Sequence, residues 1–259
     1  MKMPTVALLG LGEAGSRIAA DLAAAGLEVR GFDPDGVDVD GVTRAPDTAA
    51  AVTGCDVVLS VNSAGVALGA AASAAPALRS GALYADLNTA GPELKREVGT
   101  LVDRVGASFA DVALIGTVLT NGLRTSALAS GAGAQAFADT FSPLGMPVEV
   151  VSERPGDAAS LKLLRSVFMK GIAAAAIETL EAAEAAGQRD RLESQLAAVL
   201  GEPLLKRLVE GSHKHAARRA DEMEAARELL RTLGIEPRIA SASASLLAEL
   251  AAAPRAHER

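Results

Sequence analysis

The stretch TVALLGLGEAG, residues 5–15, decides the fold of this chain of 259 residues. It begins with TVALL, a nearly all-apolar run of the kind that forms a strand buried on both faces of a parallel sheet. The glycine-rich GLGEAG follows at once, and residues 16–25 then have the composition of a helix. This succession of strand, glycine turn and helix predicts the first βα unit of a doubly wound parallel sheet.

An acidic residue at the end of the next strand indicates that the glycine turn binds a ligand. Asp33 follows the strand-like run 27–32 and lies 23 positions after Gly10, a spacing typical of the dinucleotide-binding fingerprint. There, Gly10 permits the tight turn, Gly12 lets the backbone approach a pyrophosphate, and Gly15 packs the helix against the strand. A structural glycine turn without a ligand is the alternative. The predicted cofactor-binding residues are Gly10, Leu11, Gly12, Glu13, Ala14, Gly15, Asp33, Asn62 and Ser63.

The residues around Asp33 indicate which dinucleotide binds. Its carboxylate would accept hydrogen bonds from the adenosine ribose diol and repel a 2′-phosphate. Neither Pro34 nor Asp35 adds a cation that could hold such a phosphate. We therefore expect NAD as the cofactor, while Arg30 and Arg44 keep NADP open as an alternative.

Strand and helix patterns alternate up to residue 155. Strands are expected at 56–61, 82–87, 109–115, 126–130 and 148–151, and helices at 49–53, 66–78, 93–105 and 134–141. Asn62 and Ser63 directly follow one of these strands, where open α/β sheets bind their ligands, although a turn or a helix cap explains them equally well. Cys55 is expected to be a small core residue, because no histidine lies near it in the sequence.

The composition narrows the class of protein. Apolar residues make up 49% of the chain, aromatic residues only 2%, and tryptophan is absent, so the core must consist mainly of Ala, Leu and Val. A net charge of −7 without a basic region argues against nucleic acid as a main partner. No apolar run reaches the roughly 20 residues of a membrane span, and no signal peptide precedes the first strand. We expect a soluble, cytoplasmic protein without a disulfide.

Residues 156–186 form a second organising stretch. This segment is rich in Ala, Leu, Lys and Glu, has Asp157 as a candidate N-cap, and predicts one long helix. Nearly everything after it reads as further helices. The expected architecture is therefore an α/β Rossmann domain with a doubly wound parallel sheet over residues 1–155, followed by a small all-α domain over residues 156–259.

Four motifs come in the order and context of a known superfamily. They are GLGEAG at 10–15, DLNTAGP at 86–92, DVALIGT at 111–117 and GDAASLKLLRS at 156–166. Over about its first 190 residues the chain resembles the β-hydroxyacid dehydrogenases, which include 3-hydroxyisobutyrate dehydrogenases, tartronate semialdehyde reductases and 6-phosphogluconate dehydrogenases. The segment HKHAARRADEM resembles the small helical domain of uncharacterised 6-phosphogluconate dehydrogenase-like proteins.

The resemblance implies roles for individual residues. Lys162 matches the catalytic lysine, which acts as general acid in carbonyl reduction and as general base in the reverse direction. Asn88 and Thr89 match the substrate-binding pair, and Gly116 matches a glycine of the substrate loop. Ser166 stands one helical turn after the lysine, where these enzymes usually have asparagine, and its hydroxyl can still orient a substrate.

Two positions depart from the superfamily's pattern. Ile115 replaces a serine and Thr117 replaces a glycine, so the substrate carboxylate loses a hydrogen-bond donor and a bulkier or less polar substrate is favoured. Structural alternatives also exist for the matching residues. Lys162 could be a solvated lysine of an amphipathic helix, and Thr89 could cap the helix that follows it. Lys170 is expected to be an ordinary surface residue.

The helical part carries one dense basic cluster. Arg218 and Arg219 could bind a carboxylate or phosphate of the substrate, or they could pair with Asp221 or Glu222 on the same helix, and the sequence leaves both interpretations open. The nearby histidines lack cysteine or carboxylate partners in register, so no metal is predicted. Because the C-terminal part is short for an independent core, we expect a homodimer.

These residues predict an NAD(P)-dependent oxidoreductase that interconverts a hydroxy acid and its keto or semialdehyde form, with Lys162 as the general acid and base. A reductase of imines, or of carbonyl compounds without a carboxylate, is the close alternative, which Ile115 favours and Lys162 does not. A non-catalytic dinucleotide-binding protein is the alternative from a different class.

Overall fold

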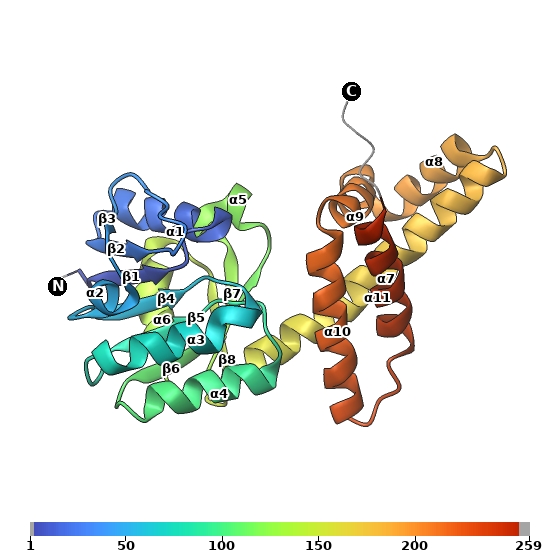
Figure 1. Ribbon diagram of the computed structural model, residues 1–259. Helices are drawn as coiled ribbons and strands as arrows, with labels where there is room; N and C mark the ends of the chain where they lie inside the picture. Colours follow the sequence, from blue (N-terminus) through green and yellow to red (C-terminus); the bar gives the residue numbers. More distant parts are fainter. Residues whose placement is uncertain (1–2, 254–259) are drawn as a thin grey trace. The chain divides into compact units, whose positions relative to one another are not determined.

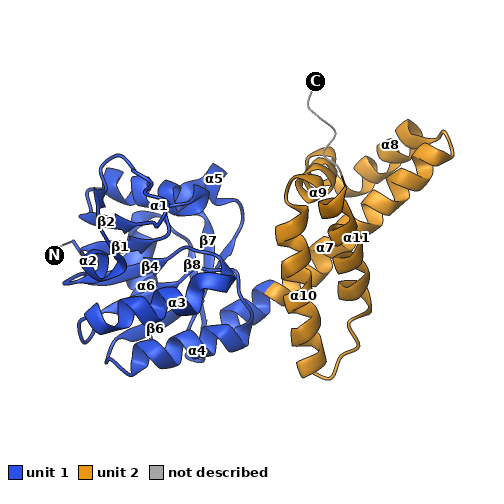
Figure 2. Cartoon of the chain, viewed as in Figure 1, with its two compact units in different colours: residues 1–162 blue, residues 163–259 orange. Residues whose placement is uncertain are grey.

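The computed structural model describes residues 3–253 of the chain. The chain divides into two compact units, Met1–Lys162 and Leu163–Arg259, which Figure 2 distinguishes by colour. The sequence pattern predicts a domain boundary between residues 155 and 156, whereas the compact units divide inside a helix seven residues later. No helix among the described residues is long and apolar enough to cross a membrane.

An eight-stranded sheet forms the centre of unit 1 (Figure 1). The strands are β1 (Val6–Leu9), β2 (Val29–Phe32), β3 (Thr43–Arg44), β4 (Val57–Ser60), β5 (Leu83–Asp86), β6 (Ser108–Ile115), β7 (Ser126–Ser130) and β8 (Val148–Ser152). Their order is β3-β2-β1-β4-β5-β6-β7-β8, and every neighbouring pair is parallel except β6 and β7. This confirms the predicted α/β class, with one antiparallel junction and the short strand β3 in addition.

Helices cover both faces of the sheet in unit 1 (Figure 1). They are α1 (Glu13–Ala24), α2 (Thr48–Val52), α3 (Ala64–Ala74), α4 (Pro92–Asp103), α5 (Val118–Asn121) and α6 (Ala134–Phe141). Alternate residues of β1 belong to different apolar clusters, since Val6 and Leu8 pack with α1 and α6 while Ala7 and Leu9 pack with α2, α3 and α4. Burial on both faces explains why β1 reads as an uninterrupted apolar run.

The long helix α7 (Asp157–Ala185) begins in unit 1 and is capped from a distant strand. The backbone N–H groups of Gly156 and Ala159 donate to one carboxylate oxygen of Asp111, over 3.1 and 3.0 Å. The predicted N-cap Asp157 is therefore wrong: it is the first helical residue, and its carboxylate accepts from Ser152 Oγ instead. The first turn of α7 thus belongs to the sheet unit because its unpaired N–H groups find their acceptor there.

Unit 2 contains the remainder of α7 together with α8 (Arg189–Leu200), α9 (Glu202–Lys214), α10 (Ala216–Thr232) and α11 (Arg238–Ala252). Its core gathers apolar residues of α7, α10 and α11, among them Leu163, Met223 and Leu247. All the described elements of this unit are helical, which confirms the predicted all-α C-terminal part.

Candidate functional site

Four neighbouring strands place a polar residue at the same level of the sheet. The register pairs Ser60 with Asp86, Asp86 with Asp111, and Asp111 with Ser130. All four residues are at most 1% exposed. In β4 and β5 they are the last residues of the strand, at the edge where open α/β sheets bind their ligands.

The glycine turn after β1 has the geometry that a dinucleotide requires. A Cβ atom on Gly10, which has φ +94°, would collide with the backbone of Val61 and with the side chain of Asn62. A Cβ atom on Gly15 would meet the carbonyl oxygen of Gly10, so the helix lies directly against the turn. Nothing lies within 4 Å of the position that a Cβ atom on Gly12 would occupy, and Gly12 is exposed. The turn therefore leaves room for a pyrophosphate where the N-terminus of α1 points outwards.

Asp33 supports the glycine turn from the end of β2. One carboxylate oxygen accepts from the backbone N–H of Leu11 over 2.6 Å, and the other accepts from the N–H of Asp35 over 3.0 Å. Arg44 lies beside the loop that follows Asp33, because its guanidinium is the nearest group to a Cβ atom built on Gly36. Arg30 points elsewhere, donating to the backbone of Thr53 and pairing with Glu28.

Asn62 connects the glycine turn to the next loop, after β5. Its side-chain amide donates to Ser60 Oγ over 3.1 Å, and its backbone N–H donates to the side-chain oxygen of Asn88. Asn88, which is 3% exposed, in turn donates from its side chain to Ser60 Oγ over 3.0 Å and to Asp86. Ser63 is exposed and stands at the N-cap position of α3 without a side-chain capping bond.

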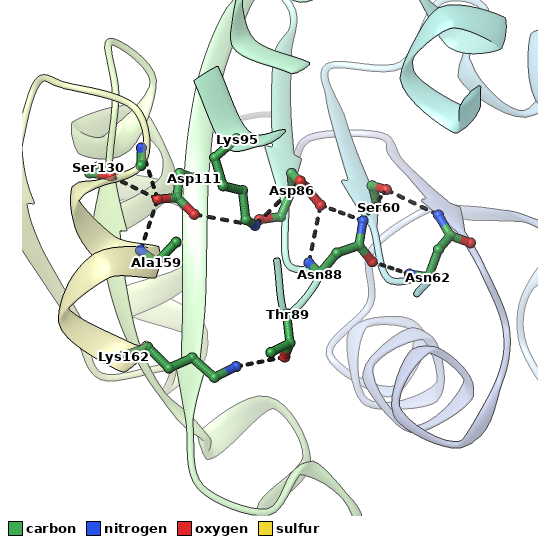
Figure 3. A network of polar contacts seen from close by, with 11 residues as sticks. Ser60, Asn62, Asp86, Asn88, Thr89, Lys95, Asp111, Ser130, Ala159 and Lys162 are labelled. Atoms are coloured by element: carbon green, nitrogen blue, oxygen red, sulfur yellow. Dashed lines mark hydrogen bonds and ion pairs between the residues drawn. The ribbon is translucent and has the colours of Figure 1, made fainter. Parts of the chain in front are cut away.

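The structure brings Lys162 and Thr89 together within unit 1. The ammonium of Lys162, in α7, donates to Thr89 Oγ1 over 2.8 Å (Figure 3). Thr89 follows β5 in the loop before α4, whose N-cap position is held by Gly91 without a side-chain bond. The two residues are half-buried and come from separate motifs of the superfamily. A proton donor and a hydroxyl thus meet at the edge of the sheet.

A buried lysine that the sequence analysis missed lies behind this pair. Lys95 on α4 is 1% exposed, and its ammonium pairs with Asp86 over 3.3 Å and with Asp111 over 3.2 Å. The sequence contains a signal for it, because Lys95 shares the buried face of α4 with Val98 and Val102. A lysine on an apolar helical stripe needs acidic partners inside the protein.

The loop after β6 contains Gly116, which the resemblance matches to a glycine of the superfamily's substrate loop. Gly116 is exposed and has φ +141°, a conformation that favours glycine. Ile115 is half-buried as the last residue of β6, and Thr117 is exposed just before α5.

In unit 2, Ser166 is buried rather than exposed. Its hydroxyl donates to Glu222 of α10, a carboxylate that also pairs with Lys170 over 3.1 Å. The expectation that Lys170 is an ordinary surface residue is wrong, since its side chain is only 16% exposed. Burial lowers the pKa of Lys170 below the usual lysine range, against the opposing effect of the Glu222 carboxylate.

The two arginines of the basic cluster behave differently. Arg219 is half-buried and donates to Ser212 Oγ over 2.6 Å and to the carbonyl of Leu208, both on α9. Burial lowers its pKa, and the neighbouring charge of Arg218 acts in the same direction. Arg218 is exposed. Among residues 3–253, no group of three or more His, Cys, Asp or Glu side chains could hold a metal ion.

Comparison with known families agrees with this geometry. The family described as the NAD binding domain of 6-phosphogluconate dehydrogenase matches residues 5–144, more than half of the chain. The chain belongs to this family. A second family, described as a domain of unknown function (DUF1932), matches residues 183–250. The 6-phosphogluconate dehydrogenase-like resemblance and the distinct helical C-terminal part predicted from the motifs are thereby confirmed.

The chain is also similar to individual proteins. An uncharacterised 28.5 kDa protein of Methanothermus fervidus is 31% identical over 144 residues, which are 54% of this chain and 55% of the relative. The match thus spans about half the length of that curated relative.

Solved structures cover nearly the whole chain. A conserved protein of unknown function, described as similar to 3-hydroxyacid dehydrogenases, is 30% identical with a TM-score of 0.75, covering 95% of this chain and 96% of that one. A Mycobacterium tuberculosis 3-hydroxyisobutyrate dehydrogenase with L-serine is 21% identical with a TM-score of 0.82, covering 97% and 94%. At that identity the second likeness concerns the fold alone.

Proposed function

We propose that the protein is an NAD-dependent dehydrogenase or reductase that interconverts a hydroxy acid and its keto or semialdehyde form. The observation that carries this proposal is the 2.8 Å hydrogen bond from Lys162 to Thr89 Oγ1. It joins a proton donor to the loop after β5, at the sheet edge next to the glycine turn. Membership of a family named for NAD binding supports a nicotinamide cofactor.

The residues of unit 1 divide the chemistry between them. A bound nicotinamide dinucleotide supplies or accepts the hydride. When hydride reaches a carbonyl carbon, negative charge develops on the oxygen, and the Lys162 ammonium stabilises this charge and donates the proton. In the oxidation direction the neutral amine of Lys162 takes the proton from the hydroxyl. Thr89 and Asn88 orient the substrate. Gly116 belongs to the loop after β6, which lies beside the substrate.

The cofactor proposal rests on the empty space around Gly12 and on Asp33. The open position above Gly12 fits a pyrophosphate, and a carboxylate at the end of β2 favours a ribose diol over a 2′-phosphate. Arg44, beside Gly36 in the loop after Asp33, is the cation that could reverse this preference.

For unit 2, we propose that Ser166 orients substrate, as the resemblance implies. We also propose that Arg218 and Arg219 hold an anionic group, because guanidinium groups bind a carboxylate or phosphate bidentately. The homodimer also stays a proposal, supported by α8, which buries none of its residues and leaves Val199 81% exposed. A monomeric mass by light scattering at micromolar concentration would exclude the dimer.

The test begins with titration of the protein by NADH and by NADPH, following nicotinamide fluorescence, which the absence of tryptophan leaves clear of protein emission. A screen of hydroxy acids with the preferred cofactor follows. We expect Lys162→Ala to keep NADH binding and to lose about 10²-fold or more in turnover, the usual contribution of a general acid. A protein that binds neither dinucleotide would overturn the proposal.

A reductase of imines or of carbonyl compounds without a carboxylate is the second candidate. One observation favours it: Ile115, at the end of β6, offers no side-chain donor where the superfamily has a serine. A screen that pairs ketones with amines and NADH or NADPH separates the two candidates. Binding of NADH without turnover of either substrate class would instead support a non-catalytic dinucleotide-binding protein.

A further inference from the structure

The buried Lys95 ammonium lies between β5 and β6, two strands of the candidate site. Because it is buried, it cannot touch a substrate. It pairs with Asp86 of β5 over 3.3 Å and with Asp111 of β6 over 3.2 Å, and donates to the backbone oxygen of Asp86 over 2.7 Å. All three residues are at most 1% exposed. Figure 3 shows the Lys95 ammonium between the two carboxylates. Buried ion clusters are seldom more stable than well-packed apolar residues of similar volume, so stability alone is a weak reason for this one.

Each of the two carboxylates uses another oxygen to hold a segment of the site. Asp86 accepts from the backbone N–H of Asn88 over 3.1 Å, and Asn88 directly precedes Thr89. Asp111 accepts from the N–H groups of Gly156 and Ala159 at the start of α7. Lys162 lies three residues after Ala159 on that helix. The cluster is therefore connected to both partners of the Lys162–Thr89 hydrogen bond.

Charge explains why a cation is needed at this point. Asp111 faces the N-terminus of α7, where the unpaired N–H groups carry partial positive charge and favour an anion. Asp86 places a second carboxylate at the same level of the neighbouring strand. Without the ammonium between them, these two buried carboxylates would repel each other and separate the segments that they hold.

We propose that Lys95, Asp86 and Asp111 form a positioning cluster that fixes the Lys162 ammonium opposite Thr89. The effect of this cluster on turnover rests on the proposed function, whereas the positioning of the Lys162 ammonium does not. Lys95 acts through the backbone of the loop after β5 and the first turn of α7, and is therefore a positioning residue rather than a catalytic one.

The test measures the reactivity of Lys162 without cofactor or substrate. Trace acylation by acetic anhydride at several pH values, read by mass spectrometry, gives the reactivity of Lys162 relative to Lys206, whose side chain is 67% exposed. A hydrogen bond donated by an ammonium favours its protonated form, and only the neutral amine is acylated. Losing the bond to Thr89 should therefore raise the relative reactivity of Lys162.

The decisive variant is Lys95→Met, which removes the cation and leaves the Asp86 and Asp111 carboxylates facing each other. Adding Asp111→Asn removes one of the two repelling charges while the asparagine oxygen can still accept from the start of α7, so the double variant should return towards the reactivity of the unmodified protein. Thr89→Val shows the effect of losing the hydrogen bond directly, with an expected rise of about two- to tenfold in relative reactivity. Arg104→Met, which removes an exposed cation at the end of the same helix, is the matched control.

The single cysteine provides a check of the fold in every variant. Cys55 is 1% exposed in the apolar core of unit 1, so a thiol that stays unreactive towards a disulfide reagent shows an intact core. If Lys95→Met fails this check, Lys95→Gln replaces it, because glutamine also removes the positive charge but can still donate a hydrogen bond to one of the two carboxylates.

The proposal expects the Lys95 variant to behave like Thr89→Val and Arg104→Met to behave like the unmodified protein. A folded Lys95 variant with unchanged Lys162 reactivity, measured beside a Thr89→Val variant that responds, would overturn it. Absence of any dehydrogenase activity would sink only the proposed function, since the labelling needs none. With an active substrate, the variant should lower kcat by more than about tenfold while KM changes less than about threefold.

Discussion

The carboxylate of Asp33 accepts a hydrogen bond from the backbone N–H of Leu11 over 2.6 Å. The acidic residue at the end of β2 and the glycine turn after β1 are thus linked before any cofactor binds. Asp33 therefore supports the turn, and we propose that it also discriminates between a ribose diol and a 2′-phosphate. A suitable substitution can separate these two tasks.

We expect Asp33→Asn to shift cofactor preference towards NADPH without loosening the glycine turn. The amide oxygen can still accept from Leu11, whereas the negative charge that repels a 2′-phosphate is gone and Arg44 remains nearby. The ratio of NADH to NADPH affinity should fall by about tenfold, equivalent to ~1.4 kcal/mol. Fluorescence titration measures both affinities, and Asp35→Asn, which alters an exposed carboxylate two residues on, should leave the ratio unchanged.

Replacing two glycines of the turn by alanine should have different effects: one substitution should weaken NADH binding and the other should destabilise the fold. Gly12→Ala places its methyl group in open space, so the stability of the free protein should change by less than about 0.5 kcal/mol while NADH binding weakens about tenfold or more. Gly15→Ala drives a methyl group into the carbonyl of Gly10 and should destabilise the protein by about 1–3 kcal/mol. Urea unfolding and NADH titration of both variants check this, and equal NADH affinity in Gly12→Ala would argue against a pyrophosphate at the turn.

Removing the buried ammonium alone should be costly. Lys95→Met leaves the Asp86 and Asp111 carboxylates buried without their cation, and we expect a loss of about 3–5 kcal/mol in the free energy of unfolding. Adding Asp111→Asn should restore part of this loss because only one buried charge remains. Urea denaturation gives the values, with Arg104→Met expected within about 0.5 kcal/mol of the unmodified protein. A Lys95→Met variant as stable as that control would show that the cluster carries little energy.

The single tyrosine should make the protein sensitive to alkaline pH. Tyr84 is fully buried, and although Ser60 is close, its hydroxyl has no well-directed hydrogen-bond partner among the described residues. Burial raises the pKa of Tyr84 far above its ordinary value of 10.0. Above pH 10 the unfolded chain therefore releases this proton while the folded protein keeps it, and stability falls as the pH rises.

Tyr84→Phe should remove this contribution. The variant should be as stable as the unmodified protein at pH 7, or about 1 kcal/mol more stable, and the difference should widen in its favour above pH 10. Urea unfolding at pH 7, 9 and 10.5 measures the difference. Buried Cys55, whose pKa is also raised by burial, adds a slope of the same sign from about pH 9 in both proteins. A constant difference across this range would contradict the assignment.

Local patterns predicted most of the fold because their physical causes are local. The apolar run of β1, the glycines after it and the periodicity of the later helices each act within a few residues of the chain. The missed elements are short: β3 consists of Thr43 and Arg44, and α5 spans four residues. Segments of this length carry no periodicity, and their conformation depends on the neighbours against which they pack.

The sequence predicted residues of the candidate site only where they match a motif of the superfamily. Lys162 and Thr89 follow from the resemblance, but their contact spans 73 positions of sequence. Lys95 was overlooked because its partners, Asp86 and Asp111, lie on two other elements and show no pairing along the chain. Asp157 was expected to cap α7, whereas the cap comes from Asp111, 45 positions before Gly156.

The sequence by itself determined the order of strands and helices along the chain, the glycine turn, and Asp33 at the end of the next strand. These features depend on backbone conformation and on burial periodicity. Only the tertiary structure decided which polar residues meet. The register of β4, β5, β6 and β7 sets Ser60, Asp86, Asp111 and Ser130 at one level of the sheet. Inside a low-dielectric core such neighbours must satisfy one another's charges and hydrogen bonds, and this requirement acts through space and leaves no period in the sequence.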